Sequence, residues 1–263
     1  MVLEAGYKGL VRPASGQSHE ESKWPTLENL SRLVIRMYDQ RWNGAFSLTK
    51  YSMDESLLDR LRKVAESRCA GNGPAHDFLH VTRVTATARY IGLAEGADLD
   101  IVVPAALLHE LFNYPKGHPQ SHCSGEVCAE QAADVLLHND CPPHLIEPIR
   151  ECIRIHAFSR GLVPETIEGK VLQDADRLDA IGAIGIARCF ATCAEMGVPF
   201  YQPDDPFCRS REPNDKRWGL DHFYRKLLRI PDGLHTAAAR AIAGDRVRVM
   251  ETFLAQLRQE ILH

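Results

Sequence analysis

Apolar residues recur at helical spacing through almost the whole of residues 53–262. The segments with this period are 53–70, 78–95, 98–111, 124–139, 143–156, 164–175, 177–196, 217–229 and 233–262. Residues three and four positions apart share one face of an α-helix, whereas half-buried strands alternate with period two, a pattern almost absent here. The sequence therefore predicts an all-α helical bundle. Residues 199–213, rich in Pro and Asp, form the one long segment predicted to be irregular.

The N-terminal part of the chain has a different character. Residues 1–24 are rich in Gly, Ser, Lys and Glu without a period, which predicts a mobile leader. Apolar residues at helical spacing in 27–42 predict an amphipathic helix, and the capping-box pattern at 52–55 predicts a second helix beginning near Met53. We therefore divide the chain into residues 1–50 and a helical domain of residues 51–263.

Composition limits the partners that the chain is suited to bind. With 31 basic and 35 acidic residues, the net charge of −4 creates no positive field for a nucleic-acid polymer or an anionic membrane. The longest apolar run, residues 101–108, is too short to span a bilayer, and the N-terminus lacks the apolar core of a secretory signal. We therefore expect a cytoplasmic protein. Its 8 cysteines include no Cys-x-x-Cys pair and are expected to be reduced and mostly buried.

Imidazoles and carboxylates stand at the ends of the apolar helical segments. Burying such groups is costly unless a cation or hydrogen bonds satisfy them, and both are ligands of divalent metal ions. The residues concerned are Asp77, His80, His109, Glu110, Asp174, Asp176 and Asp179. The pattern favours a metal site, with a structural ion pair at 109–110 and a helix-capping role for His76 as the alternatives. Gly182 and Gly185 instead predict close helix packing, because no strand or Gly-Lys-Ser/Thr motif accompanies them.

Residues 72–260 resemble the HD-domain metal-dependent phosphohydrolase superfamily, and in particular one subgroup of bacterial HD-domain hydrolases. The segment around His80, the pair His109–Glu110 and the stretches 174–187 and 222–228 carry this resemblance. It implies an HD-domain-like helical bundle with a divalent metal (Mn, Mg, Ni, Co, Zn or Fe). The implied metal ligands are His80, His109, Glu110 and Asp176, with Asp174 and Asp179 close by. Position 110 is Glu where the family pattern has Asp, and the additional methylene is expected to alter metal affinity or coordination.

The expected reaction is hydrolysis of a phosphoester. A bound divalent ion would polarise a phosphoryl oxygen and lower the pKa of a water molecule from about 15.7 to roughly 7. Asp77 or Asp179 would accept the proton. His156, near the end of a predicted helix, would bind a second metal or protonate the leaving group; the alternative is an ordinary surface histidine.

Positively charged side chains near these segments are candidates to bind substrate phosphate. They are Arg83, Arg160, Arg177, His222 and Lys226. For each arginine, the alternative is a solvated side chain. The expected substrate is a small phosphorylated metabolite, and only the family resemblance points to a nucleotide.

Two other functions remain open from the sequence alone. One is a di-iron oxygenase of the HD type, for which His138 and His156 are the available further ligands. The other is a metal-binding or ligand-binding protein in which Glu110 marks the loss of catalysis. The apolar face of residues 233–262 fits a homodimer interface as well as it fits packing on the core.

Overall fold

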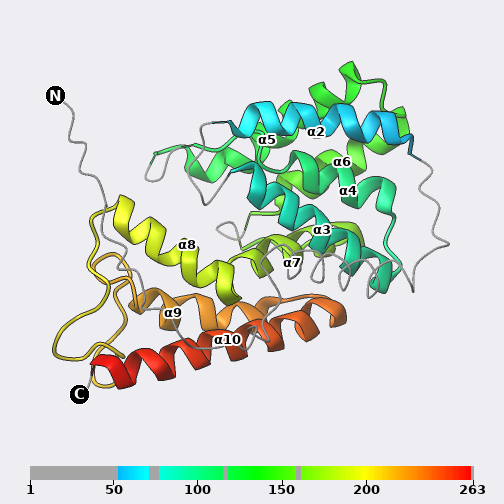
Figure 1. Ribbon diagram of the computed structural model, residues 1–263. Coiled ribbons are helices and arrows are strands. Elements are labelled where there is room, and N and C mark those ends of the chain that lie inside the picture. Colours follow the sequence, from blue (N-terminus) through cyan, green and yellow to red (C-terminus); the bar gives the residue numbers. More distant parts are fainter. Residues whose placement is uncertain (1–52, 71–76, 115–117, 158–160, 262–263) are drawn as a thin grey trace, which may run out of the picture. The chain divides into compact units, whose positions relative to one another are not determined.

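The computed structural model describes residues 53–70, 77–114, 118–157 and 161–261. The chain divides after Lys50, and every described residue belongs to the unit 51–263. The predicted leader and the predicted helix at 27–42 lie outside the described residues, as do His76 and Arg160. Within the described ranges all regular elements are helical and no strand occurs, which confirms the all-α prediction (Figure 1).

Most of the predicted helices are present with shifts of a few residues at their ends. The α-helices are α2 (Glu55–Cys69), α3 (Phe78–Glu95), α4 (Leu99–Leu108), α5 (Ser124–His138), α6 (Pro143–Ile155), α7 (Ile167–Asp179), α8 (Gly182–Glu195), α9 (Asp221–Arg225) and α10 (Ala237–Ile261). Two 3₁₀ helices, η1 (Ser121–Cys123) and η3 (Leu227–Gly233), complete the described elements. The segment predicted as one helix over 217–229 is thus the short α9 followed by η3.

Side-chain caps fix where several helices begin. Asp54 accepts a hydrogen bond from the Ser56 backbone N–H, and Thr166 accepts one from the Gly169 N–H. Asp77 and Asp98 cap α3 and α4 in the same way. Such a side chain satisfies an N–H that has no partner within the helix, and replacing it with Ala costs about 1 kcal/mol.

The predicted helix break at residue 176 is wrong. Helix α7 continues to Asp179, and the turn falls at residues 180–181 before α8. Gly182 has a φ of +80°, where a Cβ would be strained and would lie 3.0 Å from Arg246 Cγ of α10. A Cβ on Gly185 would lie 2.2 Å from the Ala180 carbonyl oxygen. The approach of Gly182 to α10 agrees with the predicted close helix packing, whereas Gly185 lies against the turn that precedes α8.

Helices α3 and α7 lie side by side in the middle of the domain (Figure 1). Helices α4 and α6 pack on one side of them and carry α2 and α5, whereas α10 packs against α7 and α8. Fully buried apolar residues such as Leu61, Ile91, Leu108, Ile149 and Leu178 fill the space between the helices. Burying each of them stabilises the fold by roughly 1.5–3 kcal/mol. The N-terminus of α3 and the C-termini of α4 and α7 meet in this interior.

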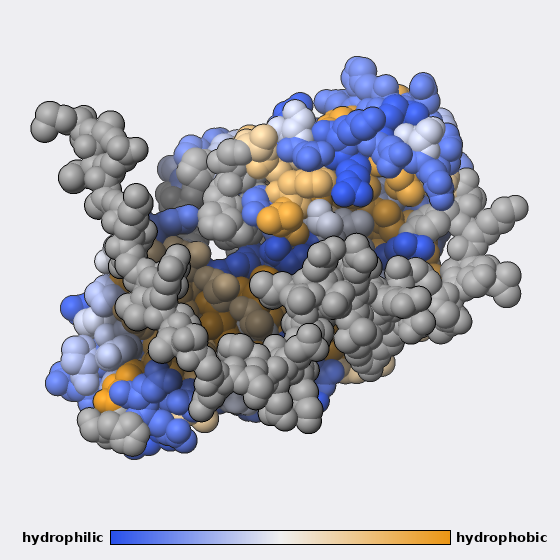
Figure 2. Space-filling model, viewed as in Figure 1, coloured by the Kyte–Doolittle hydropathy of each residue, from blue (hydrophilic) through white to orange (hydrophobic). Residues whose placement is uncertain are grey.

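The surface is consistent with amphipathic helices. Hydrophilic residues cover much of the outer face in Figure 2, and hydrophobic residues come to view in its recessed middle. Across the described ranges, no helix combines the length and the hydropathy needed to cross a membrane.

All eight cysteines are free thiols and six are buried, as predicted.

The irregular segment 199–220 is held together by a partly buried ion pair between Arg211 and Asp221. Arg211 Nη2 donates to Asp221 Oδ1 at 2.7 Å, and the Asn214 N–H donates to Asp221 Oδ2 at 2.6 Å. Asp221 is completely buried at the start of α9. This loop is therefore anchored to α9, in agreement with the prediction of an irregular segment here.

Candidate metal centre

Three helix ends bring the predicted metal ligands together. His80 lies in the first turn of α3, His109 caps the C-terminus of α4, Glu110 follows it, and Asp176 lies in the last turn of α7. His80, His109 and Glu110 are buried, whereas the Asp176 side chain is 24% exposed. The four side chains therefore converge on a point that is reached from the surface on the Asp176 side.

The ligand atoms are close enough to share one ion. His80 Nε2 lies 3.3 Å from His109 Nε2, 3.5 Å from Asp176 Oδ1 and 3.7 Å from Glu110 Oε1. One ligand atom from each of His80, His109 and Glu110 falls within 4.8 Å of the others. We refer to His80, His109, Glu110 and Asp176 as the metal cluster.

The hydrogen bonds of the two imidazoles show which nitrogen faces the cluster. His109 Nδ1 lies 2.7 Å from the Ala106 carbonyl oxygen, to which it donates, so His109 Nε2 carries the lone pair. His80 Nδ1 lies 2.7 Å from Asp179 Oδ2 and donates in the same way. Nitrogen ligands bound to one ion at about 2.0–2.1 Å are separated by roughly 3.0–3.4 Å, and the observed 3.3 Å between the Nε2 atoms agrees. The donor set therefore fits a divalent cation.

The two histidines have opposite pKa shifts in the protein without metal. Burial lowers the pKa of His109 to about 4. Burial also opposes protonation of His80, but hydrogen bonds to Asp179 and Glu110 outweigh it and raise the pKa of His80 to about 9. At neutral pH, His80 therefore carries a proton where a metal ion would bind, and His109 is neutral.

Asp179 orients His80 instead of facing the cluster. Besides His80, its carboxylate accepts hydrogen bonds from Arg83 Nε at 2.7 Å, Arg83 Nη2 at 2.9 Å and Arg188 Nη1 at 2.6 Å. Burial alone would raise its pKa, but these donors hold the pKa of Asp179 well below its usual range. A carboxylate so engaged is a poor proton acceptor, and its geometry corresponds to a residue that fixes a metal-binding histidine.

His156 brings a third imidazole to the cluster. It follows the last turn of α6, is 8% exposed, and its Nδ1 lies 2.5 Å from the Ile153 carbonyl oxygen. Its ring packs edge-on against His109, with 5.3 Å between centroids. His156 is therefore buried and is not an ordinary surface histidine.

The other predicted site residues lie in different surroundings. Asp77 is half-buried, and its Oδ1 accepts from the His80 N–H at 2.9 Å, which places it at the edge of the cluster. Arg83 reaches the cluster through Asp179. His222 of α9 pairs with Asp215 of the preceding loop at 3.0 Å, and Lys226 lies between α9 and η3.

Arg177 and Asp174 have structural contacts on another side of α7. Arg177 Nη1 donates to the Gly233 carbonyl oxygen of η3. Asp174 accepts from the backbone N–H groups of His235 and Thr236 at the start of α10. Asp174 is therefore not directed to the candidate metal site as expected, because residues 174 and 176 point to different sides of one helix.

Two residues of the site carry no signal in the sequence. Arg188 of α8 contacts Asp179, and Asn113 donates to Glu110 Oε2. The position of Arg188 depends on how α8 returns after the turn at 180–181, and a local pattern does not contain that information.

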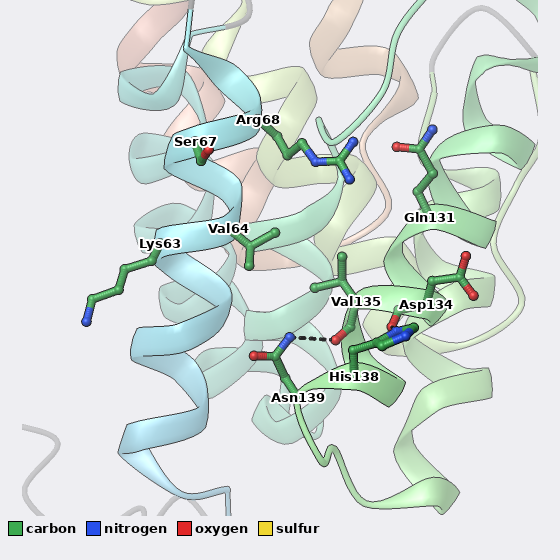
Figure 3. A pocket seen from close by; sticks show the side chains of 9 residues that line it. All are labelled: Lys63, Val64, Ser67, Arg68, Gln131, Asp134, Val135, His138 and Asn139. Carbon is green, nitrogen blue, oxygen red and sulfur yellow. Dashed lines mark hydrogen bonds between the residues drawn. The ribbon is translucent and has the colours of Figure 1, made fainter.

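An open cavity of about 600 Å³ lies away from the cluster, between α2 and α5 (Figure 3). Arg68 of α2 and Gln131 of α5 face each other across it, and none of the metal-cluster residues lines it. We therefore assign the chemistry to the metal cluster and not to this cavity.

The fold and the cluster define an all-α protein with a candidate divalent-metal centre where three helices meet. The HD domain model matches residues 77–181, a range that contains all four cluster residues. YpgQ of Bacillus subtilis is 34% identical over 207 residues, which cover 77% of this chain and 93% of YpgQ. The chain therefore belongs to the HD-domain superfamily of metal-dependent hydrolases.

Solved structures agree with this assignment. B. subtilis YpgQ in complex with ADP is similar with a TM-score of 0.59 and 34% identity, covering 78% of this chain and 97% of that one. An HD-superfamily hydrolase from Bacillus thuringiensis is similar with a TM-score of 0.61 and 30% identity, again covering 78% and 97%.

Proposed function

We propose that this protein is a divalent-metal-dependent phosphohydrolase acting on a small phosphorylated metabolite, with nucleotides as the substrate class. The observation that carries the proposal is the convergence of the metal cluster next to Arg83. His80, His109, Glu110 and Asp176 would hold the ion, which when bound activates water and polarises a phosphoryl oxygen. The donor set is compatible with Mn, Mg, Ni, Co, Zn or Fe.

Arg83 supplies positive charge for the substrate. Its Nε and Nη2 atoms are held by Asp179, so the guanidinium is fixed, and its side chain is 32% exposed. A guanidinium has five N–H donors, and those pointing away from Asp179 suit a phosphate oxygen. Asp179 binds both Arg83 and His80. The positive charge of Arg83 is therefore separated from the metal cluster only by the Asp179 carboxylate.

The proposal assigns proton transfer to two residues. Asp77 is half-buried beside His80, and one of its oxygens is occupied by the α3 cap. His156 donates from Nδ1 to the Ile153 carbonyl oxygen, so Nε2 is the atom that would pass a proton to the leaving group. We assign the proton acceptor to Asp77 instead of Asp179, because the pKa of Asp179 is depressed by its arginine partners.

The nucleotide assignment rests on similarity. The YpgQ structure contains ADP, and YpgQ is 34% identical to this chain. The position of His156 against His109 also favours a second candidate function, because a third imidazole suits a second metal ion. That candidate is the di-iron oxygenase, which would contain two irons and consume oxygen.

Metal content and phosphate release test the proposal together. The full chain would be analysed for metals by plasma mass spectrometry and assayed with nucleoside di- and triphosphates in the presence of Mn²⁺, Mg²⁺, Co²⁺ or Ni²⁺. We expect bound metal and metal-dependent hydrolysis, both lost in His109→Ala and kept in His138→Ala, which alters an exposed histidine on α5. Two irons with oxygen consumption would favour the oxygenase, and no metal in the wild-type chain would overturn both functions.

A further inference from the structure

We infer that Arg188 is a positioning residue of the metal centre, acting through Asp179 to hold His80 in its metal-binding orientation. This inference rests on the metal centre of the proposed function and assigns a role to a residue of α8, which contributes no member of the metal cluster. The contact chain runs from Arg188 to Asp179 and then to His80.

The contacts of Arg188 converge on the oxygen that orients His80. Arg188 Nη1 lies 2.6 Å from Asp179 Oδ2, the atom that accepts from His80 Nδ1 at 2.7 Å. The same nitrogen lies 3.2 Å from the Asp179 backbone carbonyl oxygen. One guanidinium nitrogen therefore ties down both the side chain and the backbone of Asp179.

Arg83 and Arg188 bind the same carboxylate from different elements and differ in exposure. Arg83 of α3 donates to both oxygens and is 32% exposed, whereas Arg188 is 19% exposed. Arg188 Nη1 lies 3.4 Å from His80 Nδ1, because both nitrogens donate to the same oxygen, Asp179 Oδ2. We therefore assign substrate contact to Arg83 and positioning to Arg188.

The charge and the planar geometry of the arginine side chain are both needed at position 188. A carboxylate buried to this degree requires charged donors, and a donor that fixes its rotamer also fixes the imidazole bound to it. Removing an outer partner of a metal-binding histidine typically weakens metal affinity about 10- to 100-fold. Lysine would keep the charge, but its single ammonium group does not reproduce the planar geometry of the guanidinium.

A double-mutant cycle on metal affinity tests the inference. The Mn²⁺ dissociation constant would be measured by titration calorimetry for the wild-type chain, Arg188→Gln, Asp179→Asn and the double variant. We expect Arg188→Gln to bind Mn²⁺ about 10- to 100-fold more weakly and Arg188→Lys to recover part of the loss. Because Arg188 acts through Asp179, its substitution is expected to have little further effect in the Asp179→Asn background.

Arg211→Gln provides the matched control. It removes an arginine that is 22% exposed and bound to a fully buried aspartate on α9, away from the cluster. We expect this variant to lower the unfolding temperature without changing the Mn²⁺ dissociation constant. Wild-type affinity in Arg188→Gln, or additive losses in the double variant, would overturn the inference while leaving the proposed function intact. Failure of the wild-type chain to bind any divalent ion would overturn the proposed function and the inference with it.

Discussion

Asp174 and Asp176 are two residues apart on α7. We predict that replacing Asp174 lowers the stability of the fold, whereas replacing Asp176 weakens metal binding. Asp174 is completely buried. It accepts from the His235 N–H at 2.9 Å, from the Thr236 N–H at 2.8 Å and from the Thr236 hydroxyl at 2.7 Å. The substitution Asp174→Ala leaves two backbone N–H groups at the start of α10 without this acceptor.

The magnitude follows from the groups left unpaired. Each buried donor without a partner costs about 1–3 kcal/mol, whereas the Thr236 hydroxyl can rotate, so the expected loss of unfolding free energy is about 2–6 kcal/mol. An exposed helix cap is worth less, and Asp54→Ala is expected to cost about 1 kcal/mol. Asp176→Ala removes a partly exposed carboxylate and is expected to leave stability almost unchanged.

Metal affinity is expected to follow the reverse order. Asp176 Oδ1 lies 3.5 Å from His80 Nε2, so Asp176→Ala removes a ligand and is expected to weaken Mn²⁺ binding at least about 10-fold. Asp174→Ala is expected to keep wild-type affinity wherever the protein is folded.

Urea unfolding in the presence of a chelator and Mn²⁺ titration calorimetry measure the two quantities separately. A loss below about 1 kcal/mol in Asp174→Ala would refute the reasoning about unpaired donors. Unchanged Mn²⁺ binding in Asp176→Ala would instead remove this residue from the metal cluster.

Three further outcomes are expected. Because carboxylates raise the pKa of His80 to about 9, its proton is bound below that pH and competes with the metal for Nε2. Mn²⁺ affinity should therefore rise by up to about tenfold per pH unit between about pH 7 and pH 9, and a flat profile in titration calorimetry would contradict this. Glu110→Gln removes a negative ligand and is expected to weaken Mn²⁺ binding at least about tenfold; equal affinity would show that Glu110 is not a ligand. Gly185→Ala places a Cβ against the Ala180 carbonyl and is expected to lower the unfolding free energy by about 1–3 kcal/mol, so an unchanged urea midpoint would argue against this close approach.

The local sequence predicts most of the helices and the types of residue in the site. Helical periodicity depends on neighbours three and four positions apart, so it predicted α3, α5 and α6 to within a few residues. Periodicity puts the break before α8 at residue 176, whereas the chain turns at residues 180–181, immediately before Gly182 with its positive φ. The leader and the helix predicted within residues 1–50 stay predictions.

Imidazoles and carboxylates beside apolar runs need a partner, so the ends of the apolar segments indicate His80, His109, Glu110 and the carboxylates of residues 174–179 as candidate ligands. The choice of Asp176 among these carboxylates comes from the family resemblance. The tertiary structure decided how their neighbours are used. It directed Asp174 to α10 and Asp179 to His80, placed Arg177 against η3, and brought Arg188 to the site from α8. Side-chain types and helical periods are local properties of the sequence, whereas the contacts of a helix face depend on how the helices pack together.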